Sequence, residues 1–323
     1  MLSRITQRQL EYFIASGEAG SILGASENIF VSSSSISAAI THIEAELGAQ
    51  LFVRHHAQGI TLTPVGQQVM TEAKLIIEQM NNLYTIASES LNSVRGPIRI
   101  GCMETLAPML SPELIYGFGK AFPGVSVSLV EGNHEDLLNK LKTAEIDIAL
   151  SYDLTTFNDL EFTPLAELPP YVMVGENHPL AEQSAVTLKD LEPYPAILLD
   201  IPYSREYFLS LYRNAGVTPE IVMKSRNSEV IRTMVANGIG YSLNNVRPKA
   251  NLSQDGKRLR SLRLSGENQA LSLGYVCAKH THKTRVISAF AQRCEMFISN
   301  QYIPGMAAPS FYDPHIVPLL KTG

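Results

Sequence analysis

One long amphipathic helix constrains the fold of this chain more than any other feature. Thr63 and Pro64 form an N-cap and first-turn pair, which is a strong helix start. Apolar or small residues then recur in steps of three and four over about four heptads, until Gly96 and Pro97 end the pattern. Such a helix usually pairs with a copy of itself, although packing against its own domain remains the alternative. The stripe consists of Val65, Val69, Ala73, Ile76, Met80, Leu83, Ala87 and Leu91.

Three short helical patterns and a strand pair precede this helix. Ser21 is a candidate N-cap of the second pattern, and Gly48 follows the third. The break between the second and third patterns spans about two residues, and three short helices with so tight a turn are typical of a helix-turn-helix. Segment 50–62 then predicts a small wing of two strand pieces around a polar tip at Gly59. The apolar stripes are Leu10, Phe13 and Ile14; Ile22, Ala25 and Ile29; and Ile36, Ile40, Ile43 and Leu47.

After residue 95, apolar strand-like runs alternate with helical runs. The first three runs, separated by two helical segments, predict a βαβαβ unit that begins a parallel sheet. Two α/β lobes, with the chain crossing between them twice, fit the complete order. The proline-containing tail from Asn300 predicts an irregular strap or partial disorder. The strand-like runs are 97–103, 125–132, 146–152, 171–180, 196–200, 220–225 and 271–278, and the helical segments are 111–121, 134–143, 204–214, 228–237 and 285–299.

Composition limits the class of protein. A formal net charge of −5 and a pI near 5.9 give no general attraction to nucleic acid, so any DNA contact must be local. No run approaches about 18 consecutive apolar residues, and the start "MLSRITQRQLEYF" has no secretory signal pattern. Cys102, Cys277 and Cys294 are too few and too separated for a disulfide framework. We therefore expect a cytoplasmic protein.

The order and spacing of several short elements in the first 66 residues resemble the LysR-type transcriptional regulators. These elements are the pair Tyr12-Phe13, Gly20-Ser21, Val31-Ser32, "IEAELGAQLFVR" from Ile43, and "LTPVG" from Leu62. The similarity continues to about residue 299, through "GCMETLAP", "VEGNHEDLLNKL", "IDIALSYDL", "YSREYFLSLYRNAGVTP" and "MVANGIGYSLNN". The tail beyond residue 300 is not part of it.

The resemblance implies an α/β multidomain protein that controls promoters in response to a small molecule. Its expected parts are a winged helix-turn-helix (1–63), a linker helix for dimerisation (64–95), a two-lobed, periplasmic-binding-protein-like (type 2) α/β effector domain (96–300) and a tail (301–323). Lobe 1 is expected over about 96–166 and 269–300, and lobe 2 over about 167–268. The implied partners are double-stranded promoter DNA, a small-molecule inducer and further copies of the chain, as a homodimer and then a homotetramer. No cofactor and no membrane are implied.

The expected reading helix lacks the cations that duplex binding normally uses. Through Arg95 the chain has five Lys or Arg residues against eight Glu, which is the wrong sign for a duplex binder. The family commonly has Gln-Pro after the "VS" element and Arg after the later Ser, whereas this chain has Ser33, Ser34 and Ala38 there. Because Arg and Gln are the bidentate base readers, direct base readout should be weak.

Hydroxyl groups and a helix N-terminus remain available for DNA. If Ser32 caps the third helix, its free N–H groups and positive dipole end can bind phosphate, and His55 and His56 add charge below about pH 6.5. A solvated helix start without any contact role is the alternative reading. We expect weak, salt-sensitive binding by each headpiece, strengthened when several headpieces act together. The DNA-binding candidates are Ser32, Ser33, Ser34, Ser35, Ser37, Thr41, Arg54 and Thr63.

The ligand of a two-lobed binder is expected between the lobes, against strand ends and helix N-termini. Several Ser and Thr residues and one Arg favour an anionic or carbonyl-bearing compound, whereas two acids favour an amine or amide. Anionic, zwitterionic and amide inducers therefore stay open. Ser204, predicted as an N-cap, and Ser228 can equally serve only as caps, and Arg205 can pair with Glu206. The ligand-binding candidates are Glu104, Thr105, Tyr152, Asp153, Ser204, Arg205, Ser228 and Ser242.

Other functions have weaker support in the sequence. No GxSxG, Walker A, HExxH or GxGxxG motif stands in context, so no enzyme is expected. His280 and His282 lack a third ligand nearby, so no metal site is expected. Cys102 and Cys277 lie in predicted buried strands and are not expected to be redox-active. The alternative kept open is a degenerate family member that acts mainly as a cytoplasmic ligand-binding protein, with weak or no sequence-specific DNA binding.

Overall fold

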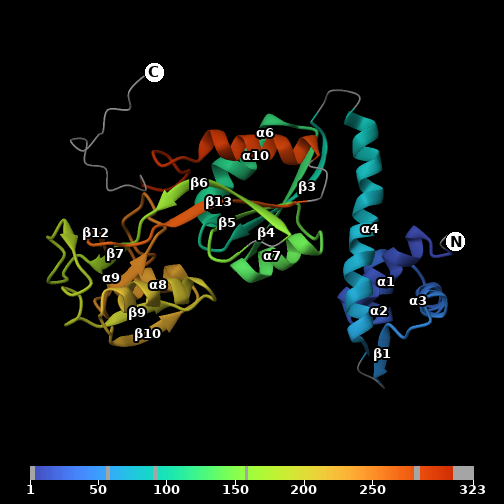
Figure 1. Ribbon diagram of the computed structural model, residues 1–323, viewed down its shortest axis with the longest axis horizontal. Helices are drawn as coiled ribbons and strands as arrows, with labels where there is room; N and C mark the ends of the chain where they lie inside the picture. The colour runs from blue at the N-terminus through green and yellow to red at the C-terminus, as the bar shows by residue number, and fades with distance from the viewer. Residues whose placement is uncertain (1–3, 56–58, 90–93, 157–158, 280–283, 308–323) are drawn as a thin grey trace. The chain divides into compact units, whose positions relative to one another are not determined.

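The computed structural model of the protein describes residues 4–55, 59–89, 94–156, 159–279 and 284–307. The chain divides after Ser93 into two compact units, coloured blue to cyan and green to red in Figure 1. Within the described ranges, no helix combines the length and apolar character that a bilayer crossing requires.

The first unit is a winged helix-turn-helix, as predicted (Figure 1). Ser21 and Ser32 cap the second and third helices by accepting hydrogen bonds from the N–H groups of Gly24 (2.9 Å) and Ser35 (3.3 Å). Apart from Leu47, which is exposed, the apolar stripes of the three helices meet in one core around the fully buried Phe13. The elements are α1 (Gln7–Ala19), α2 (Ile22–Ile29), α3 (Ser33–Leu47), the antiparallel strands β1 (Phe52–His55) and β2 (Gly59–Leu62), and α4 (Pro64–Glu89).

Helix α4 is the long helix that the sequence predicts, and its two sides differ. Met70 and Ala73 are buried in the core of the first unit, whereas Val65, Ile76 and Leu83 are 46, 48 and 65% exposed. Steps of eleven and seven residues bring these three exposed side chains to one face of a helix. Part of the stripe therefore packs against its own unit, and a second apolar line is exposed among the described residues. Leu91 lies outside the described residues.

The first lobe of the second unit is a five-stranded sheet in the order β4-β3-β5-β13-β6. Strand β3 runs parallel to β4 and β5, which confirms the predicted βαβαβ start, and β13 runs antiparallel to β5 and β6. Helices α6 and α10 cover one face and α7 the other (Figure 1). The elements are β3 (Gly96–Met103), α5 (Ala107–Leu110), the π-helical η1 (Ser111–Tyr116), α6 (Gly117–Ala121), β4 (Val125–Gly132), α7 (His134–Lys142), β5 (Ile148–Tyr152), β6 (Leu160–Leu168), β13 (Leu271–Ala278) and α10 (Arg285–Phe297).

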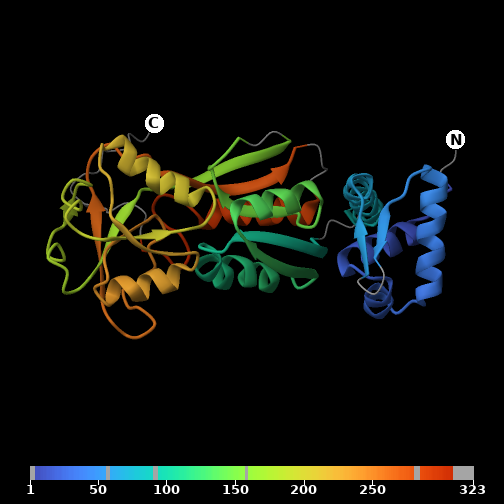
Figure 2. The ribbon, with the colours of Figure 1, turned by 90° about the horizontal axis from the view of Figure 1, so that it is seen from below.

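The second lobe is inserted between β6 and β13, so the chain crosses between the lobes twice. Figure 2 shows its yellow and orange elements beyond the green and red sheet of the first lobe. A four-stranded sheet in the order β11-β7-β12-β8 lies beside the parallel pair β9 and β10. The elements are β7 (Tyr171–Gly175), β8 (Ala185–Val186), β9 (Ala196–Leu199), α8 (Ser204–Asn214), β10 (Ile221–Ser225), α9 (Ser228–Ala236), β11 (Ser242–Asn244) and β12 (Leu259–Leu264).

Gly66 allows α4 to approach the backbone of Leu51, just before the first strand of the wing. A Cβ atom at this position would lie 2.1 Å from the carbonyl oxygen of Leu51. We expect Gly66→Ala to destabilise the first unit by about 1–3 kcal/mol, because the backbone must move apart to admit the methyl group. Calorimetric unfolding of the full chain measures this change.

Gly119→Ala in α6 is the matched control. A Cβ there would meet only Val127, at 3.7 Å. Replacing a helical Gly by Ala without a clash should be neutral or stabilising by up to about 1 kcal/mol. Equal effects of the two substitutions would show that the close approach at Gly66 is not what matters.

Candidate DNA-binding face and effector cavity

The start of α3 is a cluster of exposed hydroxyl groups that bond to one another. The Ser32 hydroxyl, besides accepting from the Ser35 N–H, lies 3.1 Å from the Ser34 hydroxyl and 2.8 Å from the Ser35 hydroxyl. Ser33 and Ser37 are half-buried, and the Thr41 hydroxyl donates to the Ser37 carbonyl (3.0 Å). The predicted candidates therefore gather along the first turns of one helix, beside the free N–H groups at its N-terminus.

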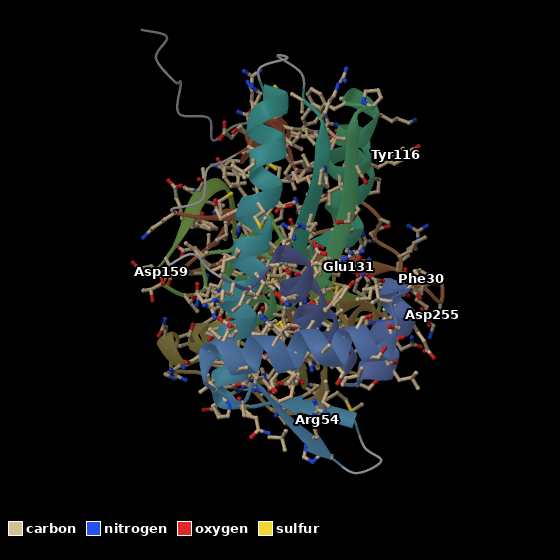
Figure 3. The ribbon with its side chains drawn as sticks, turned by 90° about the vertical axis from the view of Figure 1, so that its right-hand side faces the viewer. Phe30, Arg54, Tyr116, Glu131, Asp159 and Asp255 are labelled. Carbon is tan, nitrogen blue, oxygen red and sulfur yellow. The ribbon has the colours of Figure 1, made fainter. Side chains whose placement is uncertain are left out.

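Arg54 lies on a strand of the wing and Thr63 lies between the wing and α4, and the two residues have different surroundings. Arg54, on β1, is exposed at the edge of the unit (Figure 3). The Thr63 hydroxyl accepts from the Gly66 N–H (2.9 Å) and donates to the Gln50 carbonyl (2.8 Å), so its proton is already used. Thr63 therefore joins the wing to α4, and Arg54 offers the charge. His56 lies outside the described residues.

Phe30 is a residue of this face that the sequence reading missed. It closes α2, two residues before the cap of α3, and its ring is 95% exposed (Figure 3). Its φ of 55° lies in the left-handed region, where Gly, Asn and Asp are common and a bulky aromatic residue is strained. The signal was available: an aromatic residue stands where the turn of a helix-turn-helix calls for Gly or Asn.

The second unit contains a cavity, partly open to solvent, that is lined by residues of both lobes. Four predicted ligand-binding residues line it: Thr105, Tyr152, Ser204 and Ser228. The sequence reading missed further lining residues, which come from segments far apart in the chain. Those that matter for the chemistry are Tyr171, Phe208, Glu229, Arg232, Asn244 and Asn245.

The other four predicted ligand-binding residues do not line this cavity. Asp153 is exposed, and the buried Ser242 hydroxyl lies 3.4 Å from the Leu243 carbonyl. Glu104 is half-buried, and burial raises the pKa of its carboxyl group against the opposing charge of Arg226. The guanidinium of Arg205 is held by Asp200 and Glu206, as in the alternative reading; the paired atoms are Nη1 with Oδ1 (2.9 Å) and Nη2 with Oε1 (2.6 Å).

The predicted N-cap role of Ser204 is wrong by one residue. Helical hydrogen bonding begins earlier, because the Arg205 N–H already donates to the Ile201 carbonyl (2.8 Å). Tyr203 is therefore the N-cap residue, with a φ of 65°, and Ser204 is the first residue of α8. The shift brings the Ser204 side chain to the cavity wall.

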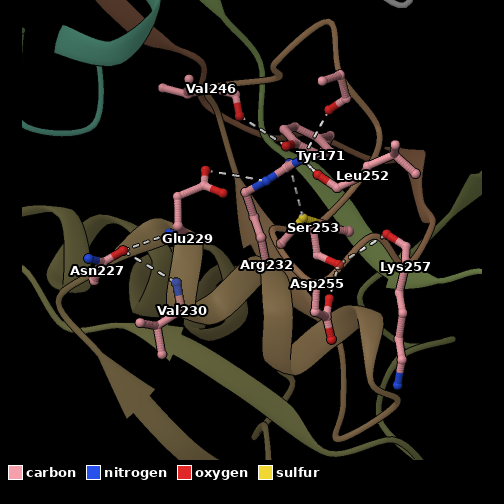
Figure 4. A network of polar contacts seen from close by, with 12 residues as sticks. Tyr171, Asn227, Glu229, Val230, Arg232, Val246, Leu252, Ser253, Asp255 and Lys257 are labelled. Carbon is pink, nitrogen blue, oxygen red and sulfur yellow. Dashed lines mark hydrogen bonds and ion pairs between the residues drawn. The ribbon is translucent and has the colours of Figure 1, made fainter.

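Arg232 lines the cavity, and Glu229 opposes its positive charge (Figure 4). Its side chain is nearly buried, and one terminal nitrogen donates to the carbonyls of Ala250 (3.0 Å) and Leu252 (2.9 Å). Its Nε lies 3.4 Å from a carboxylate oxygen of Glu229, an ion pair without hydrogen-bond geometry. The guanidinium is thus not aimed as a fork at a bound anion.

The uncharged polar groups of the cavity are incompletely satisfied. The Thr105 and Tyr152 hydroxyls bond to each other at 3.1 Å, and burial raises the pKa of Tyr152, so this phenol stays neutral. The Asn245 amide nitrogen donates to the Leu168 carbonyl (2.7 Å). Within the described part of the chain, the buried Asn245 Oδ1 and Asn244 Nδ2 have no hydrogen-bond partner. One buried acceptor and one buried donor are therefore left for a ligand or water.

The side chains of metal or redox chemistry do not gather in the described ranges. No group of three His, Cys, Asp or Glu residues suitable for a metal ion occurs there. All three cysteines are buried as free thiols, and burial raises the pKa of Cys102 and Cys294. A high pKa keeps a thiol protonated and unreactive. His280 and His282 lie outside the described residues.

Comparisons with known proteins agree with both units. The family description "Bacterial regulatory helix-turn-helix protein, lysR family" matches residues 7–67, and "LysR substrate binding domain" matches residues 91–297. GltC, a transcriptional dual regulator of Bacillus subtilis, is 30% identical over 73% of this chain and 79% of its own length. HinK, a LysR family regulator from Pseudomonas aeruginosa, matches with a TM-score of 0.63 at 33% identity, covering 91% of this chain and 98% of its own.

One further comparison concerns the fold alone. Full-length CbnR, solved with its target DNA, has a TM-score of 0.62 at 20% identity, over 90% of this chain and 99% of its own.

His134 is a buried titratable group at a contact between the two lobes. It is fully buried at the start of α7, with Nδ1 2.9 Å from the Ser151 hydroxyl and Nε2 2.9 Å from the Thr155 hydroxyl. Its ring contacts that of Tyr203, from the second lobe, with the centroids 5.5 Å apart. Burial lowers the pKa of His134 to about 4. The imidazole is therefore neutral in the folded protein at pH 5, where an unfolded chain would bind a proton.

We expect His134 to make stability depend on pH between about 6.5 and 4. The pKa of His134 is lower in the folded protein than in the unfolded chain. Its contribution to the free energy of unfolding is therefore complete above the unfolded pKa and is lost as the pH falls toward the folded pKa. Between pH 7 and 5 the free energy of unfolding should fall by about 2 kcal/mol because of this residue. Urea unfolding of the full chain and of His134→Gln at both pH values tests it, and parallel losses in the two proteins would contradict the assignment.

Proposed function

Because this chain belongs to the LysR family of bacterial transcriptional regulators, we propose that it controls a promoter through weak contacts made by each of its N-terminal headpieces. The N-terminal unit is the DNA-binding part and the two-lobed unit is the effector-binding part. The effector changes how the assembled headpieces hold or bend the promoter. We assign the chain no enzymatic step, and place it in the cytoplasm with its DNA.

The DNA contacts that we propose use the N-terminus of α3, Arg54 and the ring of Phe30. The exposed Ser34 hydroxyl and the free N–H groups of the first turn can reach phosphate oxygens, where the helix dipole favours negative charge. The Phe30 ring precedes that turn and can contact a thymine methyl group or a sugar. Few of these contacts carry charge, which supports weak binding by one headpiece.

Self-association compensates for a weak headpiece. Val65, Ile76 and Leu83 form an exposed apolar line on α4, and a second copy of the helix can cover it. Linking headpieces in this way raises the effective concentration of the second contact to about the millimolar range. We therefore propose a dimer through α4 and a tetramer built from two such dimers.

The cavity favours an uncharged ligand with a donor, an acceptor and an apolar body. Arg232 is neutralised by Glu229 and by two backbone carbonyls, so an anion gains little there. The buried Asn244 Nδ2 and Asn245 Oδ1 offer one donor and one acceptor, which an amide group matches. Among the anionic, zwitterionic and amide classes, we therefore propose an amide-like compound.

Phe30→Asn separates the binding role of Phe30 from a structural one. Asn accepts the left-handed conformation more readily, so the free energy of unfolding should rise by up to about 1 kcal/mol. If the ring contacts DNA, affinity for the gene's own upstream duplex should nevertheless fall about fivefold, or about 1 kcal/mol. Fluorescence anisotropy on the full chain measures the affinity.

Leu47→Gln, at the far end of α3, is the matched control and should leave affinity unchanged. The slope of log affinity against log salt should be the same for Phe30→Asn as for the parent chain, because no phosphate-neutralising charge is lost. A stabilised variant with undiminished affinity would remove Phe30 from the interface. Absence of any duplex binding by the parent chain would instead favour a ligand-binding protein that has lost its DNA function.

Three compounds that share a phenyl ring test the ligand class. Benzamide, benzoate and benzylamine differ in carrying a neutral, an anionic or a cationic group. We expect millimolar benzamide to raise the midpoint of thermal unfolding more than either ion does, because only the amide matches the asparagine pair without an unpaired charge. A larger shift with benzoate would refute the neutral class.

Asn244→Ala should weaken benzamide binding about tenfold while leaving stability nearly unchanged, since its buried Nδ2 has no partner within the described chain to lose. Ser242→Ala, on the same strand but away from the cavity, is the control.

A further inference from the structure

The segment after α10 belongs to the first lobe although it lies beyond the matched family domain. The family match ends at residue 297, and residues 298–307 continue without helix or strand. Ile303 and Met306 are buried in the core of the first lobe, at 1 and 3% exposure. The Asn300 Oδ1 accepts a hydrogen bond from the Glu167 N–H (2.6 Å), near the end of β6. We call residues 300–307 the strap.

The strap also bonds to a loop of the second lobe. Residues 245–250 follow β11, and the Lys249 N–H donates to the carbonyl of Gly305 (3.2 Å). The N–H of Ala307 donates to the carbonyl of Arg247 (2.9 Å). The two hydrogen bonds form a short antiparallel pairing, so the strap and the 245–250 loop are joined backbone to backbone.

Side chains support this pairing. Lys249 Nζ lies 5.5 Å from the centre of the Tyr302 ring, and the Tyr302 hydroxyl donates to the carboxylate of Glu113 in the first lobe (2.6 Å). Gly305 has a φ of 72°, and a Cβ there would lie 2.8 Å from the carbonyl oxygen of Met109. The strap therefore rests directly on the backbone of α5, and Met109 is itself part of the cavity wall.

The 245–250 loop is another wall of the cavity. Asn245, Val246 and Pro248 line it, and Pro248 pairs with Met306 of the strap. On the side of the second lobe, the Tyr171 hydroxyl donates to the Val246 carbonyl (2.9 Å). The loop is thus held from both lobes at once.

We propose that the strap is a positioning element of the effector cavity. The two covalent crossings between the lobes would by themselves allow hinge motion. The strap adds a non-covalent connection, made of backbone hydrogen bonds and buried side chains, that fixes the 245–250 wall against α5. A wall held in place before binding lowers the ordering cost of the ligand, so the strap sets effector affinity. This last step rests on the cavity being the effector site.

Hydrogen–deuterium exchange on the full-length protein tests the strap without any ligand. Ending the chain after Ser299 removes the strap, and ending it after Ala307 is the matched control. We expect the first truncation to speed exchange of the 245–250 amides at least tenfold, with protection in β5 unchanged. The control should exchange like the parent chain.

Gly305→Ala provides a second variant that keeps every buried side chain. Its Cβ would meet the Met109 carbonyl, so it should displace the strap and speed exchange of the same loop. Unchanged exchange at 245–250 in both variants would overturn the proposal. Equal loss of protection at 245–250 and in β5 would also overturn it, because the strap would then be a general part of the core.

Benzamide is the probe for the effect on affinity. The Ser299 truncation and Gly305→Ala should weaken its binding at least fivefold, while the Ala307 truncation should not. Equal affinity in all three would refute control of affinity by the strap. If benzamide does not bind even the parent chain, the proposed ligand class fails, and the exchange result still decides whether the strap holds the wall.

Discussion

A buried charge must be neutralised and hydrogen-bonded where it lies, and Arg232 imposes this demand on the second lobe. The demand is met by Glu229 one turn earlier on α9 and by the carbonyls of Ala250 and Leu252. The loop after β11 therefore has to return to α9, and this return brings Asn245 and Val246 to the cavity. The guanidinium of Arg232 therefore holds the cavity wall in place instead of binding an anion. The groups left for a ligand are the side-chain amides of Asn244 and Asn245, each with one atom that has no hydrogen-bond partner in the described chain.

The N-terminal unit follows the same principle with hydroxyl groups in place of charge. The hydroxyl groups of Ser32, Ser34 and Ser35 hydrogen-bond to one another at the start of α3, and none of them carries a charge that could pair with phosphate. Binding energy must then come from numbers of contacts, from the shape of the duplex and from linked headpieces. The exposed apolar line on α4 supplies a means of linking them. In the proposed dimer, the exposed apolar line on α4 therefore compensates for the weak DNA binding of each headpiece.

Local sequence signals were sufficient where a feature depends on neighbouring residues. The caps at Ser21 and Ser32 and the start of α4 at Thr63 were predicted, because each depends on a hydrogen bond within one turn. Strands β6 and β12 were not predicted, because their burial alternates irregularly along the strand. The helical segment predicted from residue 111 begins at Ala107, with the π-helical η1 inside it, since Pro108 and Pro112 obscured the pattern.

The candidate site was harder to predict than the fold. Thr105, Tyr152, Ser204 and Ser228 were found because strand ends and helix starts point into such a cleft. Arg205 was predicted as a ligand-binding residue and Arg232 was not, because a local pattern shows position on a helix but not burial. Only the folded chain distinguishes an arginine at the surface, held by two acids, from one enclosed by a distant loop.

The strap changes how closure of the effector domain should be understood. With two crossings, the lobes of such a domain can rotate about a hinge, and a ligand selects among the orientations. The non-covalent connection at the 245–250 loop restricts those orientations before any ligand arrives. The ligand then gains affinity from a preformed cavity. It also shifts the lobe orientations less, since a ligand shifts an equilibrium only by its differential affinity for the two states. A regulator built in this way can still respond, provided that binding strains or releases the strap itself. The signal would then pass through the hydrogen bonds of Lys249 and Ala307 rather than through the hinge strands alone.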